Sequence, residues 1–154
     1  MSKIRSELRE WLIVLIVSLL VVIPVRIFAL DNRSVPTSSM MPTILPGDRL
    51  FIDKISYRFQ KMERGDIVVF SPPPELDVQD DLIKRLIALP GDVVEIKGGI
   101  LYINDTPQHE PYINEPIKYS LTRTEVPEGK IFVLGDNRNL SYDSHIWGFA
   151  DIDS

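Results

Sequence analysis

The chain lacks cysteine and contains only two histidines among its 154 residues. The absence of cysteine excludes disulfides, thiol nucleophiles and thiolate metal sites, but it leaves the cellular compartment open. His109-Glu110 does not begin a His-Glu-x-x-His zinc pattern, and no other stretch supplies three metal ligands. We therefore expect neither a metal ion nor another cofactor.

A run of basic residues is also missing. The formal net charge is -5, and lysine and arginine are scattered among acidic residues. Proteins that bind nucleic acid usually gather basic side chains on one face, so nucleic acid is not an expected partner. The length, less a hydrophobic N-terminal segment, leaves room for roughly one small domain.

Long hydrophobic runs are limited to one, from Trp11 to Leu30. A helix needs ~20 apolar residues to cross a ~30 Å hydrocarbon core, and this run is long enough. Basic residues precede it, which favours a cytoplasmic N-terminus. We therefore predict a cytoplasmic N-terminus at residues 1–10, a transmembrane anchor at 11–30 and an extracytoplasmic domain at 31–154.

A cleaved secretory signal is the alternative interpretation of the same run, because a basic start and an apolar stretch also begin such signals. Phe28-Ala29-Leu30 is not the small-x-small cleavage pattern, and Arg26 interrupts the run near its end. A retained anchor fits better.

After the anchor, short apolar stretches alternate with glycine and proline, a rhythm typical of a mainly β domain. The stretches are Leu50 to Ile52, Asp66 to Phe70, Leu82 to Leu89, Val93 to Ile96, Ile100 to Ile103 and Lys130 to Leu134. Gly98-Gly99 predicts a tight hairpin, because glycine accepts positive φ angles, and Asn104-Asp105 predicts the next turn. Residues 72–81 and 105–129 are expected to form longer loops.

Small hydroxyl residues stand beside a Met-Met-Pro step in the stretch from Val35 to Thr43. A serine here is a poor nucleophile unless a base takes its proton. Ser38 and Ser39 carry the same chemistry, so both are candidates at this point.

Lys84 is the candidate base. In a strand, side chains two residues apart share a face. On the face that would carry Lys84, the residues are Leu82, Lys84, Leu86 and Ala88, an otherwise apolar row. Burial in such an apolar row would lower the lysine pKa from ~10.4 to the value of about 7 or 8 that a base needs near neutrality. Arg85 falls on the opposite face and stays charged. The alternative is that Lys84 merely extends its amine to water from a half-buried strand.

Three stretches, residues 35–43, 81–92 and 135–144, closely resemble the conserved boxes of type I signal peptidases. These are membrane-anchored Ser-Lys proteases that remove signal peptides. The resemblance covers about residues 33 to 150. It implies a single N-terminal transmembrane helix followed by a compact, coiled antiparallel β-sheet catalytic domain that rests on the membrane.

By matched position, the resemblance implies that Ser39 is the nucleophile and Lys84 its general base. It implies that the Thr37 hydroxyl and the Ser39 backbone N–H form the oxyanion hole, which stabilises developing negative charge. Ser141 matches a serine that hydrogen-bonds and orients the lysine. The position relative to Met40-Met41-Pro42 selects Ser39 over Ser38.

Other matched positions are expected to support the site or to bind substrate. Three charged residues are expected to support the site: Asp136, Arg138 and Asp143. Six apolar residues are expected to line shallow substrate pockets: Val35, Met40, Ile44, Leu50, Leu82 and Ile83. Ordinary core packing is the alternative for each of the six.

The resemblance also implies the partners. Signal-peptide-bearing preproteins are the expected substrates, bound as extended strands and cleaved after a small-x-small motif. The lipid bilayer is the second expected partner, and the enzyme is expected in a cell membrane with its catalytic domain on the extracytoplasmic side.

Three other functions compete with this hypothesis. A Ser-His-Asp triad would use His145 and Asp143. Self-cleaving repressor-type proteases share the Ser-Lys dyad, but they carry a DNA-binding module where this chain has an apolar run. A catalytically silent, membrane-anchored β-domain that binds exported polypeptides would not need Thr37, Ser39, Lys84 and Ser141 together.

The resemblance is incomplete in two places. Between Gly91 and Gly135 there is room for a hairpin and a loop, so the large inserted domain of some relatives is not expected. The chain ends at Ser154, soon after Trp147, whereas family members generally continue with more strand-forming sequence. Either the domain ends here or its C-terminal strands are missing.

Overall fold

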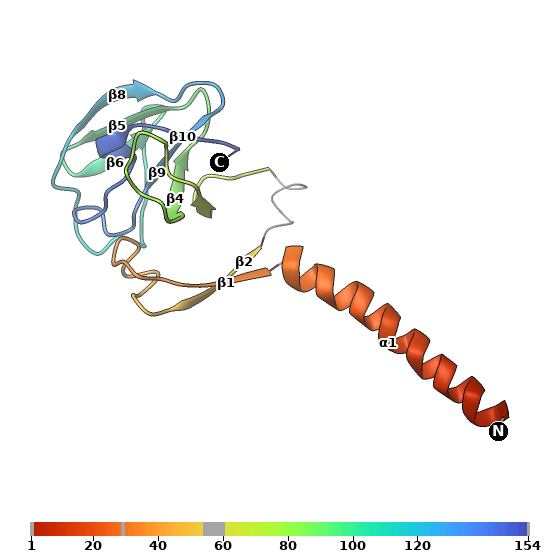
Figure 1. The fold of residues 1–154 in the computed structure, drawn as a ribbon. Helices are drawn as coiled ribbons and strands as arrows, with labels where there is room; N and C mark the ends of the chain where they lie inside the picture. Colours follow the sequence, from red (N-terminus) through yellow and green to blue (C-terminus); the bar gives the residue numbers. More distant parts are fainter. Residues whose placement is uncertain (1, 29, 54–60, 154) are drawn as a thin grey trace. The chain divides into compact units, whose positions relative to one another are not determined.

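A computed structural model describes residues 2–28, 30–53 and 61–153 (Figure 1). The chain divides into two compact units. The first comprises Met1–Arg33 with Arg49–Lys61, and the second comprises Ser34–Asp48 with Met62–Ser154.

The first unit contains helix α1 (Ser2–Phe28) and a two-stranded sheet of β1 (Leu30–Ser34) and β2 (Arg49–Asp53). The side chains from Trp11 to Leu20 on α1 are exposed. Within the described part of the chain, no helix combines the length and the apolar character that a membrane crossing needs. The transmembrane anchor at residues 11–30 stays a prediction from the sequence.

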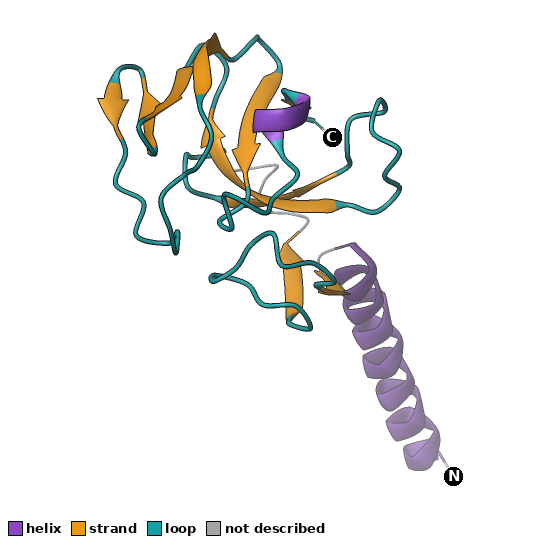
Figure 2. Ribbon diagram, turned by 90° about the vertical axis from the view of Figure 1, so that its left-hand side faces the viewer, coloured by secondary structure: helices purple, strands orange, loops and turns teal. Residues whose placement is uncertain are grey.

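The second unit contains two antiparallel four-stranded sheets and one short helix, which confirms a mainly β fold. The first sheet has the order β10 (Ala150–Asp151), β9 (Lys130–Leu134), β4 (Leu82–Ala88) and β3 (Ile67–Phe70). The second has the order β7 (Thr106–Pro107), β6 (Ile100–Ile103), β5 (Val93–Lys97) and β8 (Leu121–Glu125). Helix α2 (Ser144–Trp147) is tied to β9, where the Val133 N–H donates to Ser144 Oγ at 3.0 Å (Figure 2).

Both predicted turns are present. Gly98 and Gly99, at φ 59° and 79°, connect β5 to β6 in a hairpin that pairs Lys97 with Ile100. Positive φ values at both central residues match the right-handed twist of the flanking strands and favour glycine. Asn104 and Asp105 also have positive φ and connect β6 to β7.

Strand β9 is covered on both faces, because its alternate side chains enter two different hydrophobic clusters. Phe132 and Leu134 belong to the larger cluster, together with residues of β5 and β6 such as Val94, Ile96, Leu101 and Ile103. Ile131 and Val133 belong to the smaller cluster, with Phe70, Leu86 and Ala150. The strand therefore joins the two parts of the core.

Strand β4 contains a β-bulge that changes the predicted row of side chains. The register with β9 shifts between Leu86 and Ala88. Leu82 and Leu86 pack in the smaller cluster, whereas Ile87 and Ala88 pack in the larger one. The expectation that Ala88 shares a face with Leu86 is wrong, because the extra residue of a bulge reverses the side-chain alternation beyond it.

Replacing Phe132 with alanine tests the larger cluster. Phe132 is 1% exposed and packs edge-on against Phe149, with ring centroids 6.1 Å apart. We expect Phe132→Ala to lower the free energy of unfolding by about 3 to 5 kcal/mol in urea denaturation. Ile100→Ala, at a side chain that is 45% exposed, is the control. An equal loss in both variants would contradict the assignment of Phe132 to the core.

Candidate active site

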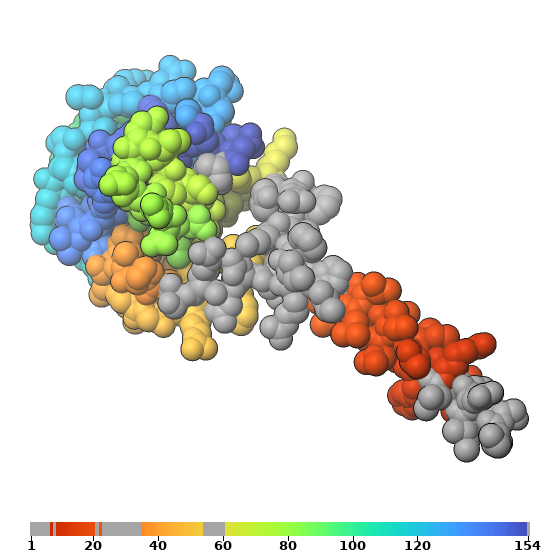
Figure 3. Space-filling view, in the orientation of Figure 1, coloured from red at the N-terminus to blue at the C-terminus, as the bar shows by residue number. Residues whose placement is uncertain are grey.

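The structure brings together the serine and the lysine that the sequence singles out. Lys84 lies on β4, and its Nζ donates a hydrogen bond to Ser39 Oγ at 3.0 Å. A second bond of 3.2 Å goes from Nζ to the carbonyl oxygen of Ile83. Ser39 lies in the nucleophile segment, which we define as residues 35–48 (orange in Figure 3) and which belongs to the same unit. A base is therefore within reach of the serine hydroxyl.

Lys84 is withheld from water, since it is only 4% exposed. Burial lowers the pKa of Lys84, and the negative charge of Asp143 acts in the opposite direction. A lowered pKa increases the fraction of neutral amine, the form that can accept a proton from Ser39. The alternative interpretation, in which Lys84 extends its amine to bulk water, is therefore wrong.

Thr37 adds a second hydroxyl beside Ser39. Its Oγ1 lies 3.3 Å from Ser39 Oγ, close enough for a hydrogen bond in which either atom can donate. Thr37 itself is exposed, so its hydroxyl can also turn toward a molecule that approaches Ser39. Ser38 makes its contact through its backbone carbonyl, and the bond from Lys84 goes to Ser39.

The loop that follows β9 holds the nucleophile segment through Asn137. The Asn137 backbone N–H donates to the Ser39 carbonyl at 3.0 Å, and its side-chain Nδ2 donates to the Ser38 carbonyl at 3.1 Å. The sequence interpretation missed Asn137. Its place in the third matched box was a signal that the residue adjoins the site, but its partners are backbone carbonyls, which leave no trace in a residue pattern.

Gly135 lies so close to the nucleophile segment that a side chain would not fit. A Cβ at this position would be 2.4 Å from the Ser39 carbonyl oxygen and 2.2 Å from Ser141 Oγ. Ser141 is thus beside Ser39 and is 4% exposed. Its Oγ has no hydrogen-bond partner among the described residues, so the bond to Lys84 that the resemblance implies is not formed in this structure.

Asp136 connects β4 to the nucleophile segment. Its carboxylate accepts two bonds from Arg85, from Nε at 2.8 Å and from Nη2 at 2.6 Å, and a third from the Thr43 hydroxyl. Arg85 is the neighbour of Lys84, and Thr43 lies four residues after Ser39. The expected supporting position of Asp136 thus has a physical basis: one buried carboxylate holds both chain segments.

Arg138 is fully buried and forms a second ion pair. Its two terminal nitrogens each donate to a Glu110 oxygen at 2.6 Å, and its Nε donates to the Gly135 carbonyl at 3.2 Å. The Tyr112 ring lies 4.0 Å from the Arg85 guanidinium, and its hydroxyl donates to Glu110 at 2.8 Å. Burial and the Glu110 carboxylate raise the pKa of Tyr112 to about 12. Glu110 and Tyr112 were not predicted, because no local pattern pairs them with residues so distant in the sequence.

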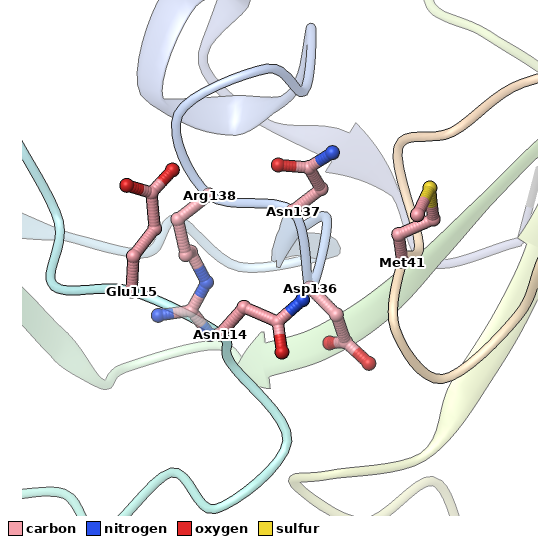
Figure 4. A pocket seen from close by; sticks show the side chains of 6 residues that line it. All are labelled: Met41, Asn114, Glu115, Asp136, Asn137 and Arg138. Atoms are coloured by element: carbon pink, nitrogen blue, oxygen red, sulfur yellow. The ribbon is translucent and has the colours of Figure 1, made fainter.

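A small pocket of about 160 Å³ adjoins these ion pairs (Figure 4). It is lined by Met41, Asn114, Glu115, Asp136, Asn137 and Arg138. All of its lining residues except Met41 are polar or charged, so the pocket differs from the apolar substrate pockets that the resemblance implies.

Asp143 is buried between the site and helix α2. One carboxylate oxygen accepts from the Gly135 N–H at 2.9 Å, and the other caps α2 by accepting from the His145 N–H at 3.3 Å. His145 Nδ1 is 2.6 Å from the same oxygen, and its ring stacks on Tyr119. The histidine is thus engaged with Asp143 and Tyr119, while Lys84 takes the hydrogen-bonding position at Ser39.

The six apolar residues expected to line substrate pockets differ in exposure. Val35, Met40 and Ile44 are 3%, 1% and 6% exposed, as core residues are. Leu82 and Ile83 are half-buried and retain surface for a ligand. Leu50, also half-buried, belongs to the first unit. Among residues 2–28, 30–53 and 61–153, no three His, Cys, Asp or Glu side chains are placed to hold a metal ion.

Comparison with known proteins gives consistent matches. The family described as "Signal peptidase, peptidase S26" matches residues 8–154. "Probable signal peptidase I-1" of Synechocystis sp. is 48% identical over 147 residues, 92% of this chain and 75% of the relative. "Signal peptidase I" of Leptolyngbya laminosa is 42% identical over 153 residues, 96% of this chain and 75% of the relative. A crystal structure of a signal peptidase I from Enterococcus faecalis V583 matches with a TM-score of 0.54 and 38% identity, covering 62% of this chain and 93% of that one.

Replacing Asp143 with asparagine tests the electrostatics of the lysine. Because the Asp143 carboxylate raises the pKa of Lys84, a neutral amide is expected to let that pKa fall further below its ordinary value. The measurement is an NMR titration of the Lys84 ¹³Cε resonance, assigned by its loss in Lys84→Met.

Asp105→Asn is the matched control, since Asp105 is exposed and pairs with Arg123. It should leave the titration of Lys84 unchanged. A Lys84 pKa that stays the same or rises in Asp143→Asn would show that Asp143 does not act on the lysine through its charge.

Proposed function

Because this chain belongs to the signal peptidase family, peptidase S26, we propose that it is a serine endopeptidase that removes signal peptides from preproteins. The observation that carries the proposal is the 3.0 Å hydrogen bond between a buried lysine amine and Ser39 Oγ. This pairing supplies a nucleophile and a base without histidine or metal.

In the proposed reaction, neutral Lys84 takes the proton of the Ser39 hydroxyl while Oγ attacks the carbonyl carbon of the scissile peptide bond. The resulting oxyanion accepts hydrogen bonds from the Ser39 backbone N–H and the Thr37 hydroxyl. The protonated Lys84 then gives its proton to the leaving amine nitrogen as the C–N bond breaks. Water, activated by the same lysine, hydrolyses the acyl-serine ester and restores the free hydroxyl.

Substrate selection would use the apolar residues beside the dyad. We propose that Leu82 and Ile83, which retain surface, contact the small side chains before the cleavage site. The buried Val35, Met40 and Ile44 would shape the pocket from beneath. Ser141, Asp136, Arg138 and Asp143 would keep the reacting groups in place.

Membrane attachment is the second part of the proposal. It is supported by the apolar run from Trp11 to Leu30 and by the exposed aliphatic side chains of α1. With basic residues before the run, the N-terminus would be cytoplasmic and residues 31–154 would act on the extracytoplasmic side. An enzyme attached there meets signal peptides where they leave the bilayer.

Cleavage of a purified preprotein by the full chain tests the catalytic assignment. Ser39→Ala and Lys84→Ala are each expected to lower kcat by about 10⁴-fold or more, because the two groups act as a unit. Ser38→Ala is the matched control and should retain activity. The product N-terminus, determined by sequencing, should follow a small-x-small site.

Two other outcomes are informative. Equal activity in Ser39→Ala would exclude Ser39 as the nucleophile. A folded, unmutated chain that binds preproteins without cutting them would favour the silent β-domain.

Flotation of the full chain with liposomes tests the attachment. Lysine near the middle of a membrane helix costs about 2.5 to 3.5 kcal/mol, so the double variant Leu15→Lys, Leu19→Lys is expected to leave the lipid fraction. Ile100→Lys places a lysine on the second unit as the control. Unchanged flotation of the double variant would show that residues 11–30 do not hold the protein on lipid.

A further inference from the structure

Asn137 contacts two successive carbonyl groups at the nucleophile. Its side-chain Nδ2 donates to the Ser38 carbonyl at 3.1 Å, and its backbone N–H donates to the Ser39 carbonyl at 3.0 Å. The Met41 N–H, at 3.1 Å, is a further donor to the Ser38 carbonyl. Figure 4 shows the Asn137 amide directed toward the chain segment that carries Met41. Three donors thus fix the two peptide planes on either side of the Ser39 Cα.

The Ser38 carbonyl and the Ser39 N–H belong to the same peptide unit. This unit is planar and trans, so the N–H points away from the carbonyl oxygen. Holding the oxygen on the Asn137 side therefore directs the N–H to the opposite side. A hydrogen bond to the carbonyl also polarises the peptide and strengthens its N–H as a donor.

We propose that Asn137 is a positioning residue for the oxyanion hole, whose side-chain amide directs the Ser39 N–H at the carbonyl oxygen of the substrate. The inference rests on the proposed function, in which that N–H stabilises the tetrahedral intermediate. The hydrogen bond from the Ser39 N–H is strongest when the substrate oxygen carries full negative charge, so this bond stabilises the transition state more than the bound substrate. The side chain makes no bond to Lys84, and the titration of the base is independent of it.

Asn139 provides a matched control in the same loop. Its side chain is hydrogen-bonded too, but its partners lie in another part of the chain. Oδ1 accepts from the Lys118 N–H at 2.9 Å, and Nδ2 donates to the Pro116 carbonyl at 3.1 Å. The Asn139→Ala variant therefore shows how much kcat changes when any asparagine side chain of this loop is removed.

The experiment compares Asn137→Ala, Asn137→Asp and Asn139→Ala with the unmutated full chain, using a signal-peptide substrate in detergent across a range of pH. Asn137→Ala is expected to lower kcat about tenfold, the effect of one lost hydrogen bond, with KM changed by less than about twofold. Asn137→Asp keeps the shape of the side chain but loses the donor, and kcat should fall at least as far. In Asn137→Ala the acid limb of the pH profile should stay in place, because it reports Lys84 and alanine adds no charge. Asn139→Ala should retain kcat.

A peptide aldehyde of the substrate sequence gives an independent reading. Ser39 Oγ adds to its carbonyl carbon and the carbonyl oxygen takes up a proton, so a hemiacetal oxygen forms where the oxyanion would lie. The affinity of the aldehyde should fall in Asn137→Ala by the same factor as kcat. The affinity of the inactive Ser39→Ala variant for a substrate peptide should stay the same when Asn137→Ala is added, because no oxyanion forms there.

The inference is overturned if Asn137→Ala and Asn137→Asp retain kcat, or if kcat of Asn137→Ala falls only together with a displaced acid limb. An equal fall of kcat in Asn139→Ala would also overturn the inference, because the fall would then come from disturbing the loop as a whole. Thermal unfolding identifies any variant that does not fold. If Asn137→Ala does not fold, the kcat of Asn137→Asp tests the inference in its place. If the unmutated chain shows no Ser39-dependent cleavage, the proposed function fails and the inference falls with it. If that cleavage is present, the Asn137 result judges the inference alone.

Discussion

The site depends on keeping one lysine amine away from water. A buried amine loses the hydration of its charged form, and each unit of lowered pKa corresponds to about 1.36 kcal/mol between its two protonation states. The chain must therefore prevent Lys84 from moving outward to recover that hydration. It does so by placing the residue on β4, which is an inner strand bonded to β3 on one side and β9 on the other. An inner strand cannot fray as an edge strand does.

The nucleophile segment has the opposite character, because residues 35–48 contain no helix or strand. Its position comes from other parts of the chain. Asp136 binds Thr43, and the loop after β9 binds the carbonyls beside Ser39. Buried ion pairs such as Arg85 with Asp136 are weak contributors to net stability, but they fix geometry because an unpaired partner would be costly. The loop after β9 is thus the part that sets the distance between serine and lysine.

Much of this arrangement could be predicted from the sequence. Glycine and asparagine turns and short apolar stretches act locally, and the six predicted stretches coincide with β2, β3, β4, β5, β6 and β9. The expectation of a longer loop at residues 105–129 was wrong, because β8 (Leu121–Glu125) lies there and pairs with β5. The pairing of Ser39 with Lys84 was predicted from resemblance, since 45 residues separate the two in the sequence. The bulge in β4, the Glu110 partner of Arg138 and the contacts of Asn137 were not predictable. Each depends on tertiary register or on a backbone partner, and neither is encoded in residue type.

The bulge in β4 has a consequence for how this protein can vary. The strand presents Leu86 to one hydrophobic cluster and, one residue later, begins to serve the other with Ile87 and Ala88. Deleting Ile87, the extra residue of the bulge, would restore regular alternation but remove one side chain from the larger cluster. A residue deleted or inserted between Leu82 and Leu86 would turn the side chains on one side of the change to the opposite face. Substitutions that preserve volume leave that division intact. Over evolutionary time, this stretch should therefore accept changes of side chain far more readily than insertions or deletions, and its length is the more strictly inherited property.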